Sequence, residues 1–239
     1  MDALFDGLGD AFRLIVHGDR DLIATTLRTL RIGVEATLLA ALLGLPLGCL
    51  LGLRRFRGRG VLLTLANAGM RTPPVVLGLL LWVALWPDSR WGGGPLAGLG
   101  WIYTLDAVIL AQTLLALPIV IALTAAAVQA VPAALLDQAR AFGASPWQTA
   151  LLALREARIG VVAALLTALG TAMAAVGAIL VVGTSLGNAT LATAALTNWE
   201  MGGQNAAAVA YGTVLLGIFL VLAAALTRLQ HRRTWAAQT

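Results

Sequence analysis

The feature that most constrains this chain is a series of apolar runs, several longer than 20 residues, in which charged residues are almost absent. A helix needs about 20 such residues to cross a hydrocarbon core about 30 Å thick. Charged residues make up only 11% of the sequence and hydrophobic residues 59%, which is unlike a soluble domain. The sequence therefore predicts an all-α membrane protein with one domain over residues 1–239. Its five transmembrane helices are expected at about residues 32–53, in a kinked span ending at residue 86, and at about 105–128, 160–182 and 206–226.

The second of these spans contains a proline break. Val61 to Met70 is typical of a helix, and Thr72-Pro73-Pro74 interrupts it, because proline lacks an amide donor and restricts the residue before it. Residues 73–86 are too few to cross a bilayer alone. The span is therefore expected to begin before the break and to be kinked there. Such a kink is equally consistent with a gate and with the packing of this span against neighbouring helices.

Glycines recur every four residues in the first span, at Gly44, Gly48 and Gly52. This spacing places them on one face of a helix and allows another helix to approach closely in lipid. Cys49 lies beside the stripe and is the only cysteine, so it forms no disulfide within the chain. It is interpreted as a small packing residue.

The basic residues favour one orientation in the membrane. All 16 are arginines, and they cluster at the ends of apolar runs and not along one soluble face, so the net charge of +5 does not indicate nucleic-acid binding. By the positive-inside rule, the N-terminus lies outside and the C-terminus inside. Eleven arginines then face the cytoplasm and five do not; the eleven are Arg54, Arg55, Arg57, Arg59, Arg71, Arg140, Arg155, Arg158, Arg228, Arg232 and Arg233.

Residues 1–28 do not resemble a cleavable signal peptide, because they begin with acidic residues and lack a basic start. Leu4, Leu8 and Phe12 recur at helical spacing, with the acidic residues elsewhere on the helical wheel. The pattern predicts an amphipathic helix lying at the membrane interface before the first span. A short globular appendage is the alternative.

The absence of lysine excludes a Walker-type nucleotide site, since the GxxxxGK[ST] loop needs one. Any ATP must therefore be bound by a partner. The sequence shows no metal-ligand cluster, and we predict neither catalytic residues nor a cofactor in this chain.

Residues 131–158 form the longest polar segment between two apolar runs. Pro132 suits the first turn of a helix, Gly143 suits a helix end, and Ser145-Pro146 supplies an N-cap followed by proline. The pattern predicts two short cytoplasmic helices with a tight corner at Gly143. Asp137, Gln138 and Arg140 are expected near the exposed side of the first.

Asp137-Gln138-Ala139, followed by three residues and Gly143, resembles the EAA loop of bacterial ABC-importer permeases. The family's leading Glu-Ala is Asp-Gln here. The run Gly143 to Gln148 and the ending Leu154-Arg155-Glu156-Ala157-Arg158 are similar to the tungstate-type branch of that family. Further similarity lies in Gly44 to Gly48, Arg55-Phe56, Thr72 to Val76 and Ala116 to Val120, and it weakens from Thr171 to Gly203.

The resemblance implies a type I ABC-importer permease in the bacterial cytoplasmic (inner) membrane. It implies a second copy of the chain, two ATPase subunits that bind the ATP, and an extracytoplasmic solute-binding protein, with tungstate as the expected cargo. Residues 131–158 would be the segment that couples the ATPase to the membrane helices, an ordinary surface helical hairpin being the alternative. The coupling residues expected from the resemblance and the local pattern are Asp137, Gln138, Ala139, Arg140, Gly143, Ser145 and Pro146.

Neutral polar residues are candidates to line the pathway, because hydroxyl and amide groups suit an oxyanion without holding it too tightly. Thr167 and Thr171 lie in the fourth span, and Thr184, Ser185 and Asn188 lie at the start of the loop expected outside. A hydrated surface loop explains these last three residues equally well. Gly183 to Gly187 also matches GxSxG, but a hydrolase elbow needs a strand before the serine.

Three alternatives stay open. Molybdate or sulfate could be the cargo, because in the family that the chain resembles the binding protein selects the anion. An ion-coupled carrier would need an ionisable residue deep in a span, whereas Glu35, Arg71 and Asp106 lie near predicted span ends. Glu35 is instead expected to pair with Arg31, four residues before it. The third alternative is a membrane scaffold that has no transport function.

Overall fold

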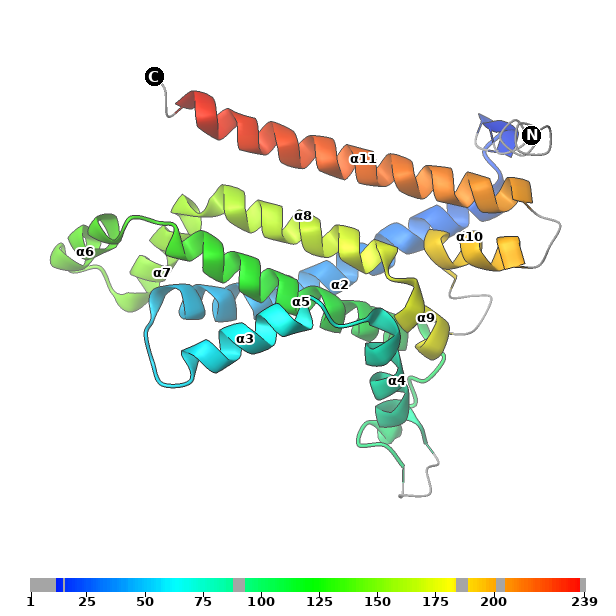
Figure 1. Cartoon of the computed structure of the whole chain (residues 1–239), viewed down its shortest axis with the longest axis horizontal. Coiled ribbons are helices and arrows are strands. Elements are labelled where there is room, and N and C mark those ends of the chain that lie inside the picture. The colour runs from blue at the N-terminus through cyan, green and yellow to red at the C-terminus, as the bar shows by residue number, and fades with distance from the viewer. Residues whose placement is uncertain (1–11, 15, 88–92, 184–188, 201–204, 237–239) are drawn as a thin grey trace. The chain divides into compact units, whose positions relative to one another are not determined.

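In the computed structural model every regular element among the described residues, 12–14, 16–87, 93–183, 189–200 and 205–236, is a helix (Figure 1). The elements are α2 (Arg20–Leu53), α3 (Arg59–Gly69), α4 (Pro74–Leu85), η1 (Ala97–Leu99), α5 (Leu105–Gln129), α6 (Ala133–Ala141), α7 (Pro146–Glu156), α8 (Arg158–Ala174), α9 (Val176–Val182), α10 (Leu191–Glu200) and α11 (Asn205–Ala236).

Within the described residues, three helices are long and apolar enough to span a membrane, or up to five candidate spans if two bent helix pairs each count as one. The three are α2, α5 and α11, and the pairs are α3 with α4 and α7 with α8. Each span predicted from the sequence overlaps one of these elements. The all-α membrane class is therefore confirmed.

The chain divides into two compact units, each assembled from three separate segments. The first comprises Met1–Glu35, Pro73–Gln112 and Ala172–Ala223, and the second comprises Ala36–Thr72, Thr113–Thr171 and Ala224–Thr239.

In the second unit the glycine stripe of α2 packs against α5. A methyl group at Gly44 would lie 2.8 Å from Cγ1 of Val120, and one at Gly52 would lie 2.6 Å from Cγ1 of Val128. At Gly48 the methyl group would lie 2.8 Å from the carbonyl oxygen of Ile121. Any side chain larger than hydrogen would push the two helices apart, so the prediction of close helix packing is confirmed.

The second unit contains two apolar clusters. One joins α2, α5 and α8 around Ala40, Val120 and Ala168, all fully buried. The other joins the ends of α2 and α5 to α6 and α7; its buried members are Cys49, Val128, Leu136, Ala153 and Ala157. This second cluster fixes α6 and α7 to the membrane helices.

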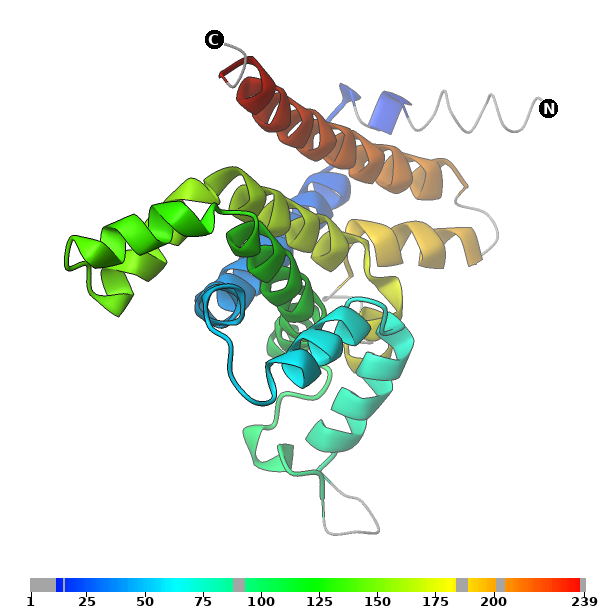
Figure 2. The same cartoon turned by 60° about the vertical axis from the view of Figure 1, so that its left-hand side comes forward.

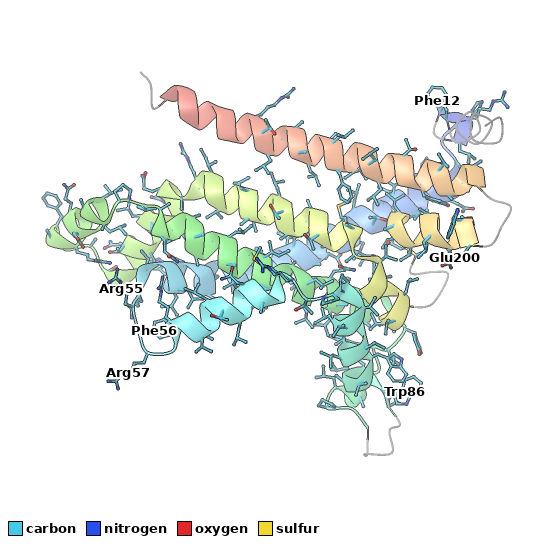
Figure 3. The ribbon with its side chains drawn as sticks, in the orientation of Figure 1. Phe12, Arg55, Phe56, Arg57, Trp86 and Glu200 are labelled. Atoms are coloured by element: carbon cyan, nitrogen blue, oxygen red, sulfur yellow. The ribbon has the colours of Figure 1, made fainter. Side chains whose placement is uncertain are left out.

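In the first unit α4 packs along α9 through small residues. A methyl group at Gly78 would lie 2.9 Å from the Cα atom of Ala178, and one at Gly177 would overlap Val75. Near the end of α4 the Trp82 indole donates a hydrogen bond of 3.0 Å to the Tyr103 hydroxyl, and the Trp82 and Trp86 rings lie 4.4 Å apart. Figure 3 shows Trp86 at this end of α4. Clustered Trp and Tyr rings are typical of a membrane–water interface.

Two boundaries differ from the sequence expectation. The helix predicted over 160–182 is broken at Ala175, where the backbone leaves helical geometry (φ −74°, ψ 101°) between α8 and α9. Arg20–Arg28, assigned to a separate interfacial helix, belongs instead to the long helix α2. Residues 1–11 of that predicted helix lie outside the described residues. The expected Arg31–Glu35 pair is present, with 2.8 Å between the charged atoms.

Candidate functional site

The polar segment at residues 131–158 folds into two short helices that pack together. The first, α6, follows Pro132 at its N-cap, and the second, α7, ends at Glu156, where α8 continues at an angle of 72°. Figures 1 and 2 both show α6 and α7 side by side, forming a hairpin. The two-helix prediction for this segment is confirmed.

The corner between the two helices depends on Gly143. Its φ of +85° is a left-handed conformation that side chains disfavour. The Gly143 amide donates to the carbonyl oxygen of Arg140 at 2.9 Å, and the Ala144 amide donates to that of Ala139 at 3.0 Å. This pair of bonds is the Schellman ending of a helix, which satisfies carbonyl groups that the helix leaves unpaired. A methyl group at Gly143 would meet nothing within 4 Å, so the requirement for glycine is conformational and not steric.

The second helix begins with a complete capping box. The amide of Gln148 donates to Oγ of Ser145 at 3.3 Å, and the amide of Ser145 donates to Oε1 of Gln148 at 2.7 Å. Pro146 occupies the first helical position, as predicted. The role of Gln148 was not predicted, although the Ser-x-x-Gln spacing signals it. Two reciprocal bonds and a proline therefore hold the corner rigid.

The polar residues of α6 lie on its exposed side. Asp137 and Arg140 are 67% and 52% exposed, and they form an ion pair of 2.9 Å. Gln138 is also exposed and Ala139 is half-buried, whereas Leu136 points into the apolar cluster that contains Cys49. A surface ion pair contributes little stability, about 0–1 kcal/mol. The structure thus brings the predicted coupling residues together on one short hairpin.

Two aromatic residues next to the corner were missed. Phe142 is 91% exposed and Trp147 is 76% exposed, on either side of Gly143 to Pro146. Large exposed apolar side chains beside a rigid turn indicate a contact surface for a protein or a membrane. Their presence in an otherwise polar segment was the signal available in the sequence.

The hairpin is joined to the membrane helices by more than apolar contacts. The thiol of Cys49 in α2 donates to the carbonyl oxygen of Ala150 in α7 at 3.7 Å, a distance appropriate for sulfur. Ala153 and Ala157 are buried in the same cluster as Val128 of α5. The hairpin is therefore in direct contact with α2 and α5, and it continues into α8.

The hydroxyl groups of two predicted pathway residues, Thr167 and Thr171, are hydrogen-bonded within their own helix. The hydroxyl of Thr167 donates to the carbonyl oxygen of Ala163 at 2.8 Å, and that of Thr171 donates to Thr167 at 3.0 Å. Each proton is therefore used within α8, and each hydroxyl would have to rotate before it could donate to an anion. Thr184, Ser185 and Asn188 lie outside the described residues.

Gln112 of α5 is a buried polar residue that was not singled out from the sequence. It is fully buried, and its Nε2 donates to the carbonyl oxygen of Ala175 at 3.2 Å, at the break between α8 and α9. Its Oε1 has no hydrogen-bond partner among the described residues. Those residues include no group of three or more potential metal ligands.

The chain matches the family described as binding-protein-dependent transport system inner membrane component over residues 44–236. It belongs to this family of permeases. The hairpin, the glycine stripe and the α4–α9 contact all lie within the matched residues.

Two named relatives match almost the whole permease. A probable anion ABC transporter permease protein of Haloferax volcanii is 37% identical over 220 residues, covering 88% of this chain and 91% of the relative. The tungstate uptake system permease protein TupB of Campylobacter jejuni is 30% identical over 232 residues, covering 97% and 94%.

A solved structure shows the same fold. The inward-facing MetNI methionine ABC transporter matches with a TM-score of 0.69 at 21% identity, covering 87% of this permease and 93% of that chain. The permease therefore has the type I ABC-importer transmembrane fold that the sequence predicts, and it is a multi-pass protein of the cytoplasmic membrane.

Proposed function

We propose that this permease is the transmembrane subunit of an ATP-driven importer for an oxyanion, with tungstate as the first candidate. An anion as the cargo is supported by the similarity, over nearly the full chain, to relatives named for anion and tungstate transport. Molybdate and sulfate are the alternative cargoes, because the relative with the higher identity is named only for an anion.

We infer that the partners are those of binding-protein-dependent importers: a second copy of the permease, two ATPase subunits, and an extracytoplasmic binding protein that delivers the anion. The chain contains no lysine, so a Walker-type site for ATP must belong to the ATPase subunits.

The hairpin of α6 and α7 is the proposed docking element for the ATPase. Closure of the ATPase dimer on ATP would displace Asp137 to Gly143. The corner at Gly143, Ser145 and Pro146 does not bend easily, so the displacement passes through α7 to α8 and, through the cluster around Cys49, to α2 and α5. The result is alternating access by rigid-body tilting.

The test is purification of the tagged permease from its native membranes in mild detergent, followed by ATPase assays of the eluate. Assays are run without anion and with tungstate, molybdate or sulfate. We expect an ATPase subunit to co-purify and its hydrolysis to respond most strongly to tungstate. Hydrolysis that responds only to molybdate or sulfate reassigns the cargo. Absence of any ATPase subunit contradicts the importer and favours an ion-coupled carrier or a scaffold.

Gly143→Val tests the coupling corner in the same preparation. Valine in a left-handed conformation costs about 1–2 kcal/mol, so the corner should relax to another geometry. We expect hydrolysis to persist but to lose its response to the anion, with loss of uptake. Gly143→Asn is the matched control, since asparagine tolerates this conformation and should retain most of the coupling. Normal uptake by the valine variant would contradict the proposal.

A further inference from the structure

A polar pocket lies where the end of α2 meets the hairpin. Its volume is about 250 Å³, and it has one arginine from each side, Arg54 after α2 and Arg140 from α6. The remaining lining residues are Leu53, Ala144, Pro146 and Thr149. Arg140 contacts Asp137 through Nη1 alone, and a guanidinium group has five N–H donors. Arg54 has no ion-pair partner among the described residues, so the pocket keeps positive charge available for an anion.

An apolar pocket of about 370 Å³ adjoins the polar one and shares Leu53, Arg54 and Pro146 with it. It runs between α2 and α7; its other lining residues include Leu45, Pro46, Cys49, Leu50, Trp147 and Leu154. Leu50 is 41% exposed and Trp147 is 76% exposed, so the pocket is open along one side. One continuous depression therefore has a charged end and a hydrocarbon end.

The two ends match the layers of a membrane. From Leu45 to Arg54 the helix rises about 14 Å, at about 1.5 Å per residue, which is close to the thickness of one hydrocarbon leaflet. Leu45 to Leu53 lie within the predicted first span, and Arg54 begins the loop that the positive-inside rule places in the cytoplasm. Along α2, the charged end of the depression thus lies at headgroup depth and the apolar end at acyl-chain depth.

We propose that this depression binds an anionic phospholipid of the inner leaflet. The phosphate lies between Arg54 and Arg140, and an acyl chain lies along α2 beside Trp147. Basic pockets at the cytoplasmic ends of transmembrane helices bind anionic lipid headgroups by this charge complementarity. A lipid held there contacts the hairpin directly, so membrane composition would influence the coupling element. Lipid binding at this depth requires the predicted orientation of the permease and is independent of the cargo.

Two observations favour a lipid over a protein partner. The apolar end extends along α2 as far as Leu45, inside the predicted span, where a soluble subunit does not reach. A second apolar pocket of about 270 Å³, between α2, α3 and α5, is lined only by Leu, Ala, Pro and Ile residues and has no group for a phosphate. Only the depression at the hairpin combines both chemistries among the pockets described here.

The test is native mass spectrometry of the full-length permease with its co-purified subunits, titrated with phosphatidylglycerol and, separately, with phosphatidylcholine of the same acyl chains. We expect tighter binding of phosphatidylglycerol. Arg54→Gln and Arg140→Gln should each weaken it about fivefold and leave phosphatidylcholine unchanged. Ala150→Phe, which fills the apolar pocket, should weaken both lipids.

Arg57→Gln is the matched control, because Arg57 lies in the same loop but points away from the chain and does not line the pocket (Figure 3). It should change binding by less than about twofold. An equal loss of phosphatidylglycerol binding in Arg57→Gln and Arg54→Gln would overturn the proposal. It would show that diffuse electrostatic attraction, and not this site, holds the lipid. Unchanged lipid binding in Arg54→Gln and Ala150→Phe, together with release of the ATPase subunits, would overturn it in favour of a protein-docking surface.

Discussion

Gly48 and Gly170 illustrate how similar glycines can have different importance in a membrane protein. Both lie inside predicted spans, Gly48 in α2 and Gly170 in α8. A methyl group at Gly48 would meet the Ile121 carbonyl oxygen and the Thr124 side chain at 2.8 Å, whereas one at Gly170 meets nothing within 4 Å. Backbone atoms cannot move aside as a flexible side chain can, so Gly48 is required by its neighbours.

We predict that Gly48→Ala lowers the free energy of unfolding by about 1–3 kcal/mol, because the added methyl group overpacks the contact between α2 and α5. Gly170→Ala adds the same atoms without a clash. It should leave stability unchanged or raise it by up to about 1 kcal/mol, through helix propensity. Thermal unfolding of the purified permease in detergent measures both. Equal effects of the two variants would show that the glycine stripe does not determine this packing.

At the scale of elements, the break between α8 and α9 depends on a contact distant in sequence. Ala175 leaves helical geometry without a proline, and its carbonyl oxygen accepts a hydrogen bond from Gln112, 63 residues earlier. A carbonyl group exposed by a helix break and buried in a membrane protein needs such a partner. Gln112 is therefore interpreted as the residue that stabilises the broken conformation.

Gln112→Met should loosen α9, because methionine has a similar length but donates no hydrogen bond to the Ala175 carbonyl group. Loss of one buried bond of about 1 kcal/mol predicts about fivefold faster amide exchange in α9. Hydrogen–deuterium exchange with mass spectrometry measures this rate. Thr124→Val is the control, because the buried Thr124 hydroxyl has no partner among the described residues and its removal should leave α9 unchanged. Unaltered amide exchange of α9 in Gln112→Met would show that Gln112 does not stabilise the break between α8 and α9.

At the scale of the whole molecule, the charge distribution predicts that α6 and α10 face opposite sides of the membrane. The hairpin is expected in the cytoplasm, and the loop that contains α10 is expected outside. Phe142 and Trp199 are 91% and 66% exposed, so each position is suitable for chemical labelling. Cys49 is the only native cysteine and is buried, which makes the background low.

On a Cys49→Ala background, Trp199→Cys should react with a membrane-impermeant maleimide added to intact cells. Phe142→Cys should react only after the membrane is opened, because the bilayer separates it from the reagent. The extent of labelling is read by the mass shift of the purified permease. Labelling of Phe142→Cys in intact cells, with protection of Trp199→Cys, would reverse the orientation and with it the cytoplasmic placement of the hairpin.

Much of the architecture is encoded in short-range signals. Apolar runs determine the membrane class because each helix must by itself remove its backbone groups from lipid. The ends of α6 and α7 were predictable from Pro132, Gly143 and Ser145, since caps and left-handed glycines act within about four residues of the chain. The glycine stripe of α2 likewise predicted a close helix contact, although it did not identify α5 as the partner helix.

Other features were decided by tertiary structure alone. The break at Ala175 has no local sequence signal, and the partner of its carbonyl group comes from another helix. Arg54 and Arg140 line one pocket although 85 residues separate them in the sequence. Sequence patterns specify which face of a helix is apolar, but they do not specify which distant side chain packs there. That choice depends on the shapes and polar groups of residues that meet only after the helices have assembled.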